Sequence, residues 1–238
     1  MNARRLVTLV VLAAAGCTVE QSAAEYGEAL FADPAVAGSS RNTFACATCH
    51  QTGATDDLSR IDSGANLRGV AARASFWGGQ ELRLLDAVNA CLIFFMRAPR
   101  PLDEDDLDGH ALAAYLESIT PSGSPTDTLP FTVQENVLDF PVGGDAARGA
   151  VAYDAACGNC HGALHTGSGG LLGATSRTIL PELTDEYATL FPGFDPRLVV
   201  TEKVRHGRFF DIGGAMPLYS LEALDDATLA DILAHVLP

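Results

Sequence analysis

The pentapeptide Cys-x-x-Cys-His occurs twice in this chain, at residues 46–50 and again at residues 157–161. Two thiols at this spacing can add to the vinyl groups of one haem, while the adjoining imidazole can bind its iron. The chain has only six Cys and six His among 238 residues, so two complete copies are improbable by chance. The sequence therefore predicts two covalently attached c-type haems, with attachment through Cys46, Cys49, Cys157 and Cys160 and iron ligation by His50 and His161.

Two other chemistries also use a Cys-x-x-Cys pair, namely a structural zinc site and a redox-active dithiol. A single zinc site built from both pairs would leave His50 and His161 without a role. A thioredoxin-like dithiol would need an alternating strand and helix pattern, which the sequence does not show. Covalent haem attachment is the interpretation that uses every residue of both motifs.

The first residues have the composition of a bacterial export signal. Arg4 and Arg5 precede the apolar stretch 6–15, whose length lies within the usual range of about 7 to 15 residues and is too short to span a membrane. The following Ala14-Ala15-Gly16-Cys17 resembles a lipoprotein box, so residues 1–17 are expected to be a lipoprotein signal segment ending at a lipidated Cys17. This predicts a periplasm-facing protein anchored by lipid. Thr18, rather than an Asp, follows the lipidated Cys, and by analogy with other lipoproteins this favours the outer membrane. The alternative is an ordinary signal peptide that is cleaved nearby, which would release a soluble periplasmic protein.

Charge excludes one class of partner. Without the two leader arginines the chain has 13 basic and 30 acidic residues, a formal net charge of −17. Such a chain will not bind nucleic acid, whereas its acidic surface favours basic partners, an attraction that weakens in salt. Periplasmic or membrane redox proteins are the partners expected for exported haems. Four of the six Cys belong to the motifs and Cys17 to the anchor, which leaves Cys91 without an intramolecular disulfide partner.

The chain divides into two halves with the same order of parts. Residues 121–144 are rich in turn-forming Pro, Gly and Ser, and they predict a linker between a haem domain at 18–120 and another at 145–238. Each half has a Gly-containing amphipathic helix, the motif, a long irregular segment, a Met and a final helix. The apolar stripes of the final helices agree in register, with apolar residues 16 and 20 places after Met96 and after Met216. Asp103 and Asp225 are expected to cap these two helices.

The second half resembles a class I cytochrome c domain. The resemblance runs from Asp145 through the second motif to Met216-Pro217 and the closing helix, and it implies that His161 and Met216 are the two axial ligands of its iron. A thioether is a weak, soft ligand that raises the reduction potential of a haem. The expected fold is mainly α, with two tandem class I cytochrome c-like domains joined by long irregular connections.

The first half resembles the N-terminal haem domain of the thiosulfate dehydrogenase type of dihaem cytochromes, which are related to the haem subunits of sulfur-oxidising complexes. The matching residues are Asn89, Cys91 and Met96, together with Phe76-Trp77 and the segment 66–73. In that family the Cys thiolate ligates the active-site haem, which implies Cys91 as the sixth ligand and as the catalytic group if the protein is an enzyme. The internal register favours Met96 instead, and both alternatives stay open.

Five arginines between residues 61 and 100 give this segment a local positive balance, and Arg can hold either haem propionates or a small sulfur oxyanion.

Two functions follow from these motifs and resemblances. The first is a dihaem c-type cytochrome that transfers electrons in the bacterial periplasm between a donor and an acceptor redox protein. The alternative is an oxidoreductase similar to thiosulfate dehydrogenase or tetrathionate reductase, with the first haem as its active site. The motifs alone require only the first function, so an electron-transfer protein is favoured over an enzyme.

Overall fold

The structure is a computed structural model, and it describes residues 21–164, 189–207 and 216–237. Within these ranges the regular structure is helical, and the chain forms no β-strand beyond one isolated bridge between Phe76 and Glu81. The mainly α fold predicted from the sequence is confirmed. Cys17 and the whole export segment lie outside the described residues.

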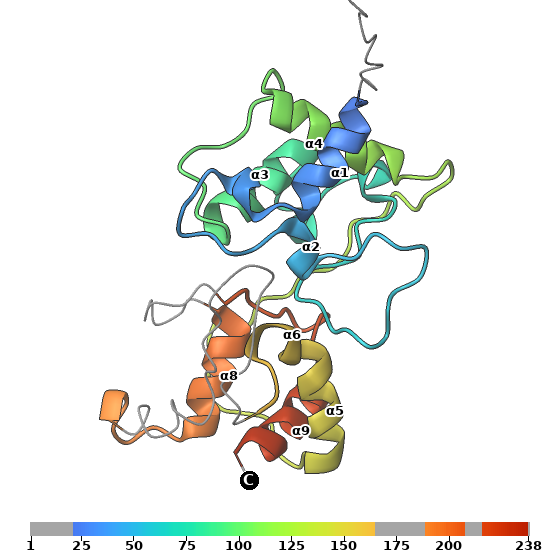
Figure 1. Ribbon diagram of the computed structural model, residues 1–238. Helices are drawn as coiled ribbons and strands as arrows, with labels where there is room; N and C mark the ends of the chain where they lie inside the picture. Colours follow the sequence, from blue (N-terminus) through green and yellow to red (C-terminus); the bar gives the residue numbers. More distant parts are fainter. Residues whose placement is uncertain (1–20, 165–188, 208–215, 238) are drawn as a thin grey trace, which may run out of the picture.

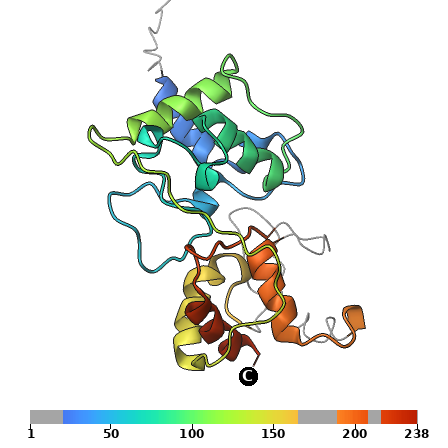
Figure 2. The ribbon, with the colours of Figure 1, turned by 180° about the vertical axis from the view of Figure 1, so that it is seen from behind.

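The helices gather in two groups, one above the other in Figure 1 and again in the reverse view of Figure 2. The first group contains α1 (Ala23–Ala32), α2 (Cys46–Cys49), α3 (Leu84–Phe94) and α4 (Leu107–Ser118), with short 3₁₀ turns η1 (Pro34–Ala37), η2 (Val70–Ala72) and η3 (Trp77–Gly79). The second contains α5 (Ala146–Ala156), α6 (Gly158–His161), α8 (Pro196–His206) and α9 (Asp226–Val236). Each motif thus forms a short helix, and α2 and α6 lie where the two groups face each other.

Side-chain caps determine where several helices begin. Ser22 and Glu25 form a capping box at α1, in which the Ser22 hydroxyl accepts from the Glu25 amide and the Glu25 carboxylate accepts from the Ser22 amide. Asp225 caps α9 by accepting from the amide of Thr228 at 2.7 Å, as predicted. The prediction that Asp103 caps the other final helix is wrong. The acidic run forms a turn in which the Asp106 carboxylate accepts from the Asp103 amide, and α4 begins only at Leu107.

Two close helix crossings organise the groups, and both depend on a glycine. A Cβ placed on Gly27 of α1 would lie 2.0 Å from the carbonyl oxygen of Ala111 in α4. A Cβ on Gly149 of α5 would lie 1.9 Å from the carbonyl oxygen of Asp231 in α9. The first and last helices of each half therefore approach backbone to backbone, which is the same arrangement made twice along the chain.

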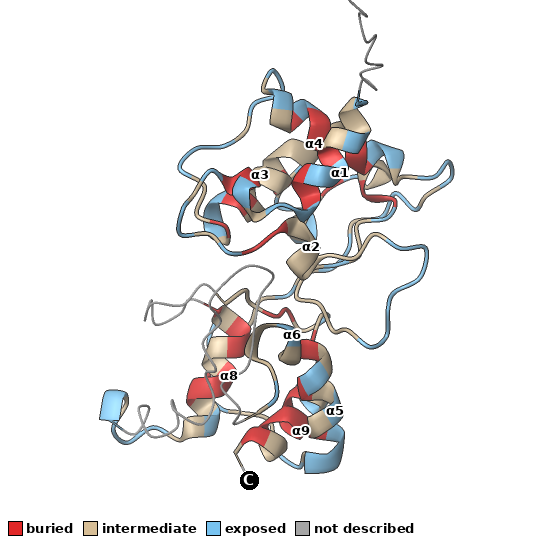
Figure 3. Ribbon diagram, viewed as in Figure 1, coloured by how far each residue is buried: buried red, intermediate tan, exposed pale blue. Residues whose placement is uncertain are grey.

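Each group has its own hydrophobic core, shown in red in Figure 3. The first core lies between α1, α3 and α4 and includes Leu30, Leu92 and Leu112. The second lies between α5, α8 and α9 and includes Leu229 and Leu233. Burying a leucine fully contributes roughly 2 kcal/mol, so each core is a separate source of stability. The two cores fall on either side of segment 121–144, although the exact domain boundaries stay a prediction.

Segment 121–144 is attached to both groups along its length. The carbonyl of Thr126 accepts from Ala74 in the first half at 2.8 Å. Thr132 donates to the Glu222 carboxylate in the second half from its amide at 2.8 Å and from its hydroxyl at 2.6 Å. The segment predicted as a linker therefore runs along both halves and helps to hold them together.

Arg205 is a buried cation that fastens the segment after Met216 to α8. Its guanidinium is fully buried and donates to the carbonyl of Leu224 at 2.6 Å and to the Asp226 carboxylate at 2.7 Å. Longer bonds of 3.3 Å reach the carbonyls of Tyr219 and Ser220. A buried charge needs hydrogen-bond partners, and the two terminal nitrogens of Arg205 find theirs along residues 219–226, which fastens this segment across the second core, whereas its Nε makes no hydrogen bond.

Candidate haem sites

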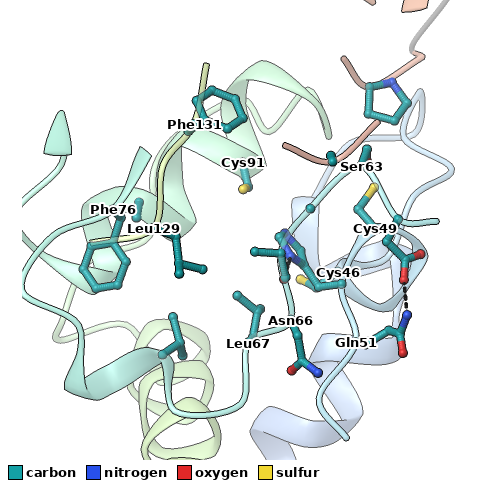
Figure 4. A pocket seen from close by; sticks show the side chains of 18 of the residues that line it. Cys46, Cys49, Gln51, Ser63, Asn66, Leu67, Phe76, Cys91, Leu129 and Phe131 are labelled. Atoms are coloured by element: carbon teal, nitrogen blue, oxygen red, sulfur yellow. Dashed lines mark hydrogen bonds between the residues drawn. The ribbon is translucent and has the colours of Figure 1, made fainter. Parts of the chain in front are cut away.

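A cavity of about 560 Å³ opens beside the first motif (Figure 4). Its wall includes Cys46, Cys49 and His50 from the motif, Cys91 from α3, and residues of the segment 217–223 from the second half. Most of the lining is apolar, with a few polar groups. A cavity of this size and character can hold a large flat cofactor and keep water from it.

His50 is held in the orientation that a metal ligand needs. Its Nδ1 lies 2.8 Å from the carbonyl oxygen of Ala65. A carbonyl can only accept, so Nδ1 carries the hydrogen and Nε2 keeps its lone pair. Burial of the ring is the main cause that lowers the pKa of His50, which favours the neutral form that binds iron. The residues present therefore fit an axial imidazole ligand.

Gly64 makes room for this imidazole. A Cβ at Gly64 would lie 2.2 Å from Cε1 of His50 and 2.8 Å from its Nε2, much closer than carbon atoms approach without a bond. The amide of Gly64 also donates to the carbonyl of Cys49 at 3.0 Å, which ties residues 63–65 back to the motif. The ring of His50 is thus enclosed between its own helix and a glycine 14 residues further along the chain.

The motif thiols are buried and protonated in the protein alone. Burial raises the pKa of Cys46 to about 12 and that of Cys49 to about 11, the latter against an opposing hydrogen bond from Ser63. Figure 4 shows Cys46 at the edge of the open space and Cys49 beside Ser63. Both thiols are free of disulfides, as covalent attachment of a haem requires.

Cys91 and Met96 both line the same cavity, so the structure brings both predicted sixth ligands to the site. Figure 4 shows the Cys91 sulfur directed into the open space. Burial and the nearby thiols of Cys46 and Cys49 raise the pKa of Cys91, so it is a thiol in the protein alone, whereas an iron bound to it would favour the thiolate. Met96 is only 4% exposed and packs within the first core.

The end of α3 determines where these two side chains lie. The amides of Phe95 and Met96 both donate to the carbonyl of Cys91, and the amide of Ala98 donates to that of Leu92 at 2.9 Å. Arg97 adopts the left-handed conformation with φ 57°, which ends the helix. Asn89 donates to the carbonyl of Leu102 and accepts from its amide, so its role is to fasten the chain that follows Met96.

The second motif lies at the end of α5, where Cys157 caps the helix and His161 is the last residue of α6. Burial raises the pKa of Cys157 to about 12 and also raises that of Cys160. Cys157 and Met216 both pack against the second core. Met216 also lines a second cavity of about 490 Å³ with Trp77, Phe95 and other side chains of the first half. Residues 165–188 and 208–215, which adjoin these groups in sequence, lie outside the described ranges.

The two motifs lie close together, which the sequence could not show. A charge on Cys160 would raise the pKa of Cys49, and Arg60 and Asp62 act on both of these thiols. The amide of Ile61 donates to the carbonyl of Ala155, two residues before the second motif, at 3.0 Å. Any cofactors attached at the two motifs would therefore be neighbours.

The five arginines predicted as one positive cluster separate in the structure. Arg83 pairs with Glu104, and Arg100 pairs with Asp106 at 2.9 Å, both on the surface. Arg73 is the one of the five that lines the first cavity, where it is half-buried and donates to the carbonyl of Asn66 at 2.7 Å. Arg60, which lies just outside the predicted group, lines the cavity as well.

Two features are absent from the described ranges. No helix there is both long and apolar enough to cross a lipid bilayer. No group of three or more His, Cys, Asp or Glu side chains there is arranged to hold a metal ion.

Comparison with known proteins finds a family model that matches the second half. Residues 144–236 match the family model described as cytochrome C oxidase, cbb3-type, subunit III. The match covers less than half of the chain and is confined to its second half. The matching region includes Cys157, Cys160 and His161 of the second motif.

A more distant likeness extends over most of the chain. A solved structure of thiosulfate dehydrogenase (TsdBA) from Marichromatium purpuratum, in its as-isolated form, is 23% identical, with a TM-score of 0.44, over 90% of this chain and 45% of that one. The present chain thus spans less than half the length of that protein, and a likeness at this level says nothing about activity. No curated protein matches the chain.

Sequence reasoning missed several residues at the site. Gly64 and the carbonyl of Ala65 have no local pattern, because they meet His50 only through the fold. Arg60, Asp62 and Tyr219 are likewise ordinary residues in the sequence. The sequence offers no signal for segment 60–65 beyond its position shortly after the first motif.

Proposed function

We propose that this protein is a dihaem c-type cytochrome that transfers electrons in the bacterial periplasm between a donor and an acceptor redox protein. The observation that carries the proposal is the spatial one: two Cys-x-x-Cys-His motifs, far apart in the sequence, lie next to each other at the junction of the two halves. The family match at residues 144–236 supports the assignment of the second motif.

The roles of the residues follow from their chemistry. Cys46 and Cys49 would hold the first haem and Cys157 and Cys160 the second, and the bound irons would supply reversible one-electron chemistry. His50 supplies a neutral imidazole whose tautomer is fixed by the Ala65 carbonyl. The apolar wall of the first cavity excludes water from the cofactor, which favours the state of lower charge.

For the second site we propose His161 and Met216 as the axial ligands, on the resemblance to class I cytochrome c domains. A thioether ligand would raise the reduction potential of the haem bound there. For the first site the sixth ligand is Cys91 or Met96, since both line the cavity. The two choices give different potentials, because a thiolate donates electron density to iron and lowers the potential.

The location is a proposal from the sequence alone. A lipidated Cys17 would anchor the protein to a membrane, facing the periplasm and most consistent with the outer membrane. The formal charge of −17 in the mature chain would steer basic redox proteins to it. Globomycin blocks the signal peptidase of lipoproteins, so accumulation of the unprocessed precursor in its presence would support the anchor, and normal processing would contradict it.

A redox titration of the purified full-length protein tests the proposed function. We expect it to take up two electrons per chain reversibly, with low-spin spectra in both oxidation states. It should also exchange electrons with a small basic redox protein at a rate that falls as salt is added, because the docking is electrostatic. Uptake of one electron or none, or exchange that salt does not affect, would contradict the proposal.

A second candidate function is favoured by one observation, the free Cys91 thiol directed into the first cavity, where Arg73 is also found. In this alternative, two thiosulfate ions join through a new sulfur–sulfur bond to form tetrathionate and release two electrons, or the reverse occurs. Cys91 would be the catalytic group, and Arg73 would hold an oxyanion, since a guanidinium donates to two oxygens at once.

Spectra and turnover of a Cys91→Ala variant distinguish the two candidates, with Met96→Leu as the parallel variant. The enzyme candidate predicts that Cys91→Ala alters the spectrum of one haem and abolishes turnover of thiosulfate with an electron acceptor and of tetrathionate with a reduced dye. An unchanged spectrum in Cys91→Ala, a changed one in Met96→Leu and no turnover by the wild type would leave only the electron carrier.

A further inference from the structure

Segment 60–64 lies between the two motifs and is bonded to the first one. The amide of Gly64 donates to the carbonyl of Cys49 at 3.0 Å. The guanidinium of Arg60 reaches the carbonyls of Ala47 and Thr48 at 3.4 and 3.5 Å. The segment therefore contacts the backbone of α2 at several points within the first motif itself.

The same segment is bonded to the approach of the second motif. The amide of Ile61 donates to the carbonyl of Ala155 at 3.0 Å, and its side chain packs against the second core although it belongs to the first half. Ala155 lies at the end of α5, two residues before Cys157. A single stretch of five residues thus connects the backbones that carry the two pairs of attachment cysteines.

Tyr219 reinforces this connection. Its side chain is buried, and its hydroxyl donates to the carbonyl of Ala156 at 2.7 Å, with the carbonyl of Ile61 at 3.4 Å. Burial raises the pKa of Tyr219 well above its ordinary value, so the hydroxyl keeps its proton and remains a donor. Tyr219 also follows Met216 by three residues, so it links the predicted ligand segment to the second motif.

A charged pair lies within the same segment. Arg60 and Asp62 form an ion pair at 2.5 Å, and the Asp62 carboxylate also accepts from the side-chain amide of Gln51 at 2.7 Å. These two charges act on both Cys49 and Cys160, in opposite directions. Because the charges compensate each other, the segment brings no net charge between the motifs.

We propose that segment 60–64 and Tyr219 form an inter-haem bridge, which fixes the spacing of the two haem sites and so sets how fast an electron passes between them. The inference rests on the proposed function, in which both motifs carry haem. Electron transfer slows steeply as the distance between cofactors grows. A hydrogen-bonded connection that holds the two attachment points at a set distance therefore controls the rate of electron transfer between the haems.

The variant Tyr219→Phe tests the bridge in the full-length protein with both haems attached. Loss of one net hydrogen bond is expected to speed exchange of the Ile61 amide hydrogen about fivefold, because the junction opens more often. The same loss should slow electron equilibration between the haems after pulsed reduction and weaken the magnetic interaction between the two ferric irons. Haem content should stay at the wild-type value.

Tyr153→Phe is the matched control. Tyr153 is also buried in the second half, and its hydroxyl has no hydrogen-bond partner among the described residues. It should change none of these readouts. Equal changes in both variants would show general loosening of the second core and would overturn the bridge.

The charged pair provides a second, independent variant. Arg60→Gln leaves the Asp62 carboxylate uncompensated beside both motifs, so both midpoint potentials should fall together, since negative charge favours the oxidised iron. Arg83→Gln makes the same charge change at the surface pair with Glu104 and should leave both potentials near their wild-type values. A fall in the midpoint potential of only one haem in Arg60→Gln, or equal falls in Arg60→Gln and Arg83→Gln, would overturn a bridge shared by both sites.

These experiments distinguish failure of the inter-haem bridge from failure of the proposed dihaem function. Two haems in the wild type with unchanged exchange, equilibration and magnetic interaction in Tyr219→Phe would overturn the bridge while the dihaem function stands. Fewer than two haems in the wild type would overturn the proposed function and the bridge with it.

Discussion

Gly64 illustrates how a residue without any functional group can determine the first haem site. Its Cα lies against the His50 ring, and a methyl group there would lie 2.2 Å from Cε1. We predict that Gly64→Ala displaces the imidazole from its bond to the Ala65 carbonyl and weakens its ligation to iron. The expected result is loss of the low-spin spectrum of one haem of the two, measured by absorption and by electron paramagnetic resonance.

Gly158→Ala is the control for this variant. Gly158 lies inside the second motif, yet its added Cβ would meet nothing closer than 3.8 Å, an ordinary contact distance. It should retain both spectra. Normal low-spin spectra for both haems in Gly64→Ala would contradict the proposed position of the His50 ring.

At the scale of single residues, the sequence predicts what covalent chemistry requires and misses what the fold supplies. The spacing of Cys46, Cys49 and His50 carries its own chemical reason, so the sequence alone is enough to predict their roles. The supporting groups, Gly64 and the Ala65 carbonyl, meet the imidazole across a loop without a pattern. Cys91 and Met96 stay alternatives as the sixth ligand, because the end of α3 presents both to one cavity.

Among the elements, the crossing of α5 and α9 is the contact most sensitive to a small change. Gly149→Ala would place a methyl group 1.9 Å from the Asp231 carbonyl oxygen, so the helices must move apart. Overpacking of this kind costs about 1–3 kcal/mol. We predict a loss of unfolding free energy in that range, measured by guanidinium denaturation of the haem-loaded protein.

Gly27→Ala tests the same geometry in the first half, where the added methyl would lie 2.0 Å from the Ala111 carbonyl oxygen. It should destabilise to a similar degree. Changes smaller than about 0.5 kcal/mol in both variants, the usual size for surface substitutions, would contradict the backbone-to-backbone crossings.

Glu222 joins segment 121–144 to the second half in a way that depends on pH. Its bonds from Thr132 lower the pKa of Glu222 from 4.5 to about 2. A lowered pKa contributes stability that is present above pH 4.5 and is lost as the pH falls through about 2. We predict that Glu222→Gln destabilises the protein at pH 7 by about 1 kcal/mol, a modest value because the carboxylate is exposed and screened by solvent.

Urea denaturation of the wild type and of Glu222→Gln at pH 7 and pH 3 checks this dependence. The difference in unfolding free energy should shrink at the lower pH, because the carboxylate of the unfolded wild-type chain is then largely protonated. A difference that is constant or larger at pH 3 would show that the Thr132 bonds do not stabilise the charged form.

The sequence predicted the order of elements better than their ends. The apolar register of the final helices, relative to Met96 and Met216, predicted α4 and α9, and the internal repeat predicted that each half ends on such a helix. The start of α4 was misjudged because the acidic run at 103–106 satisfies its own backbone in a turn held by Arg100. Side-chain competition of this kind is invisible to a pattern of apolar residues.

At the scale of the whole molecule, the position of one half against the other could not be predicted. The junction depends on isolated bonds such as those of Ile61 and Tyr219, which have no periodicity. Yet this junction brings the two motifs together, and in the proposed function it places two haems where an electron can pass between them. The central claim is therefore that both motifs carry haem in the same folded chain.

The mass of the purified mature protein under denaturing conditions, after acid–acetone treatment to strip any haem that is not covalently held, tests this claim most directly. We predict the mass of the chain plus two haems, plus one haem when Cys46 and Cys49 are both changed to Ala, and plus one haem when Cys157 and Cys160 are. A wild-type mass with one haem or none, or a double variant that still retains two, would contradict the account.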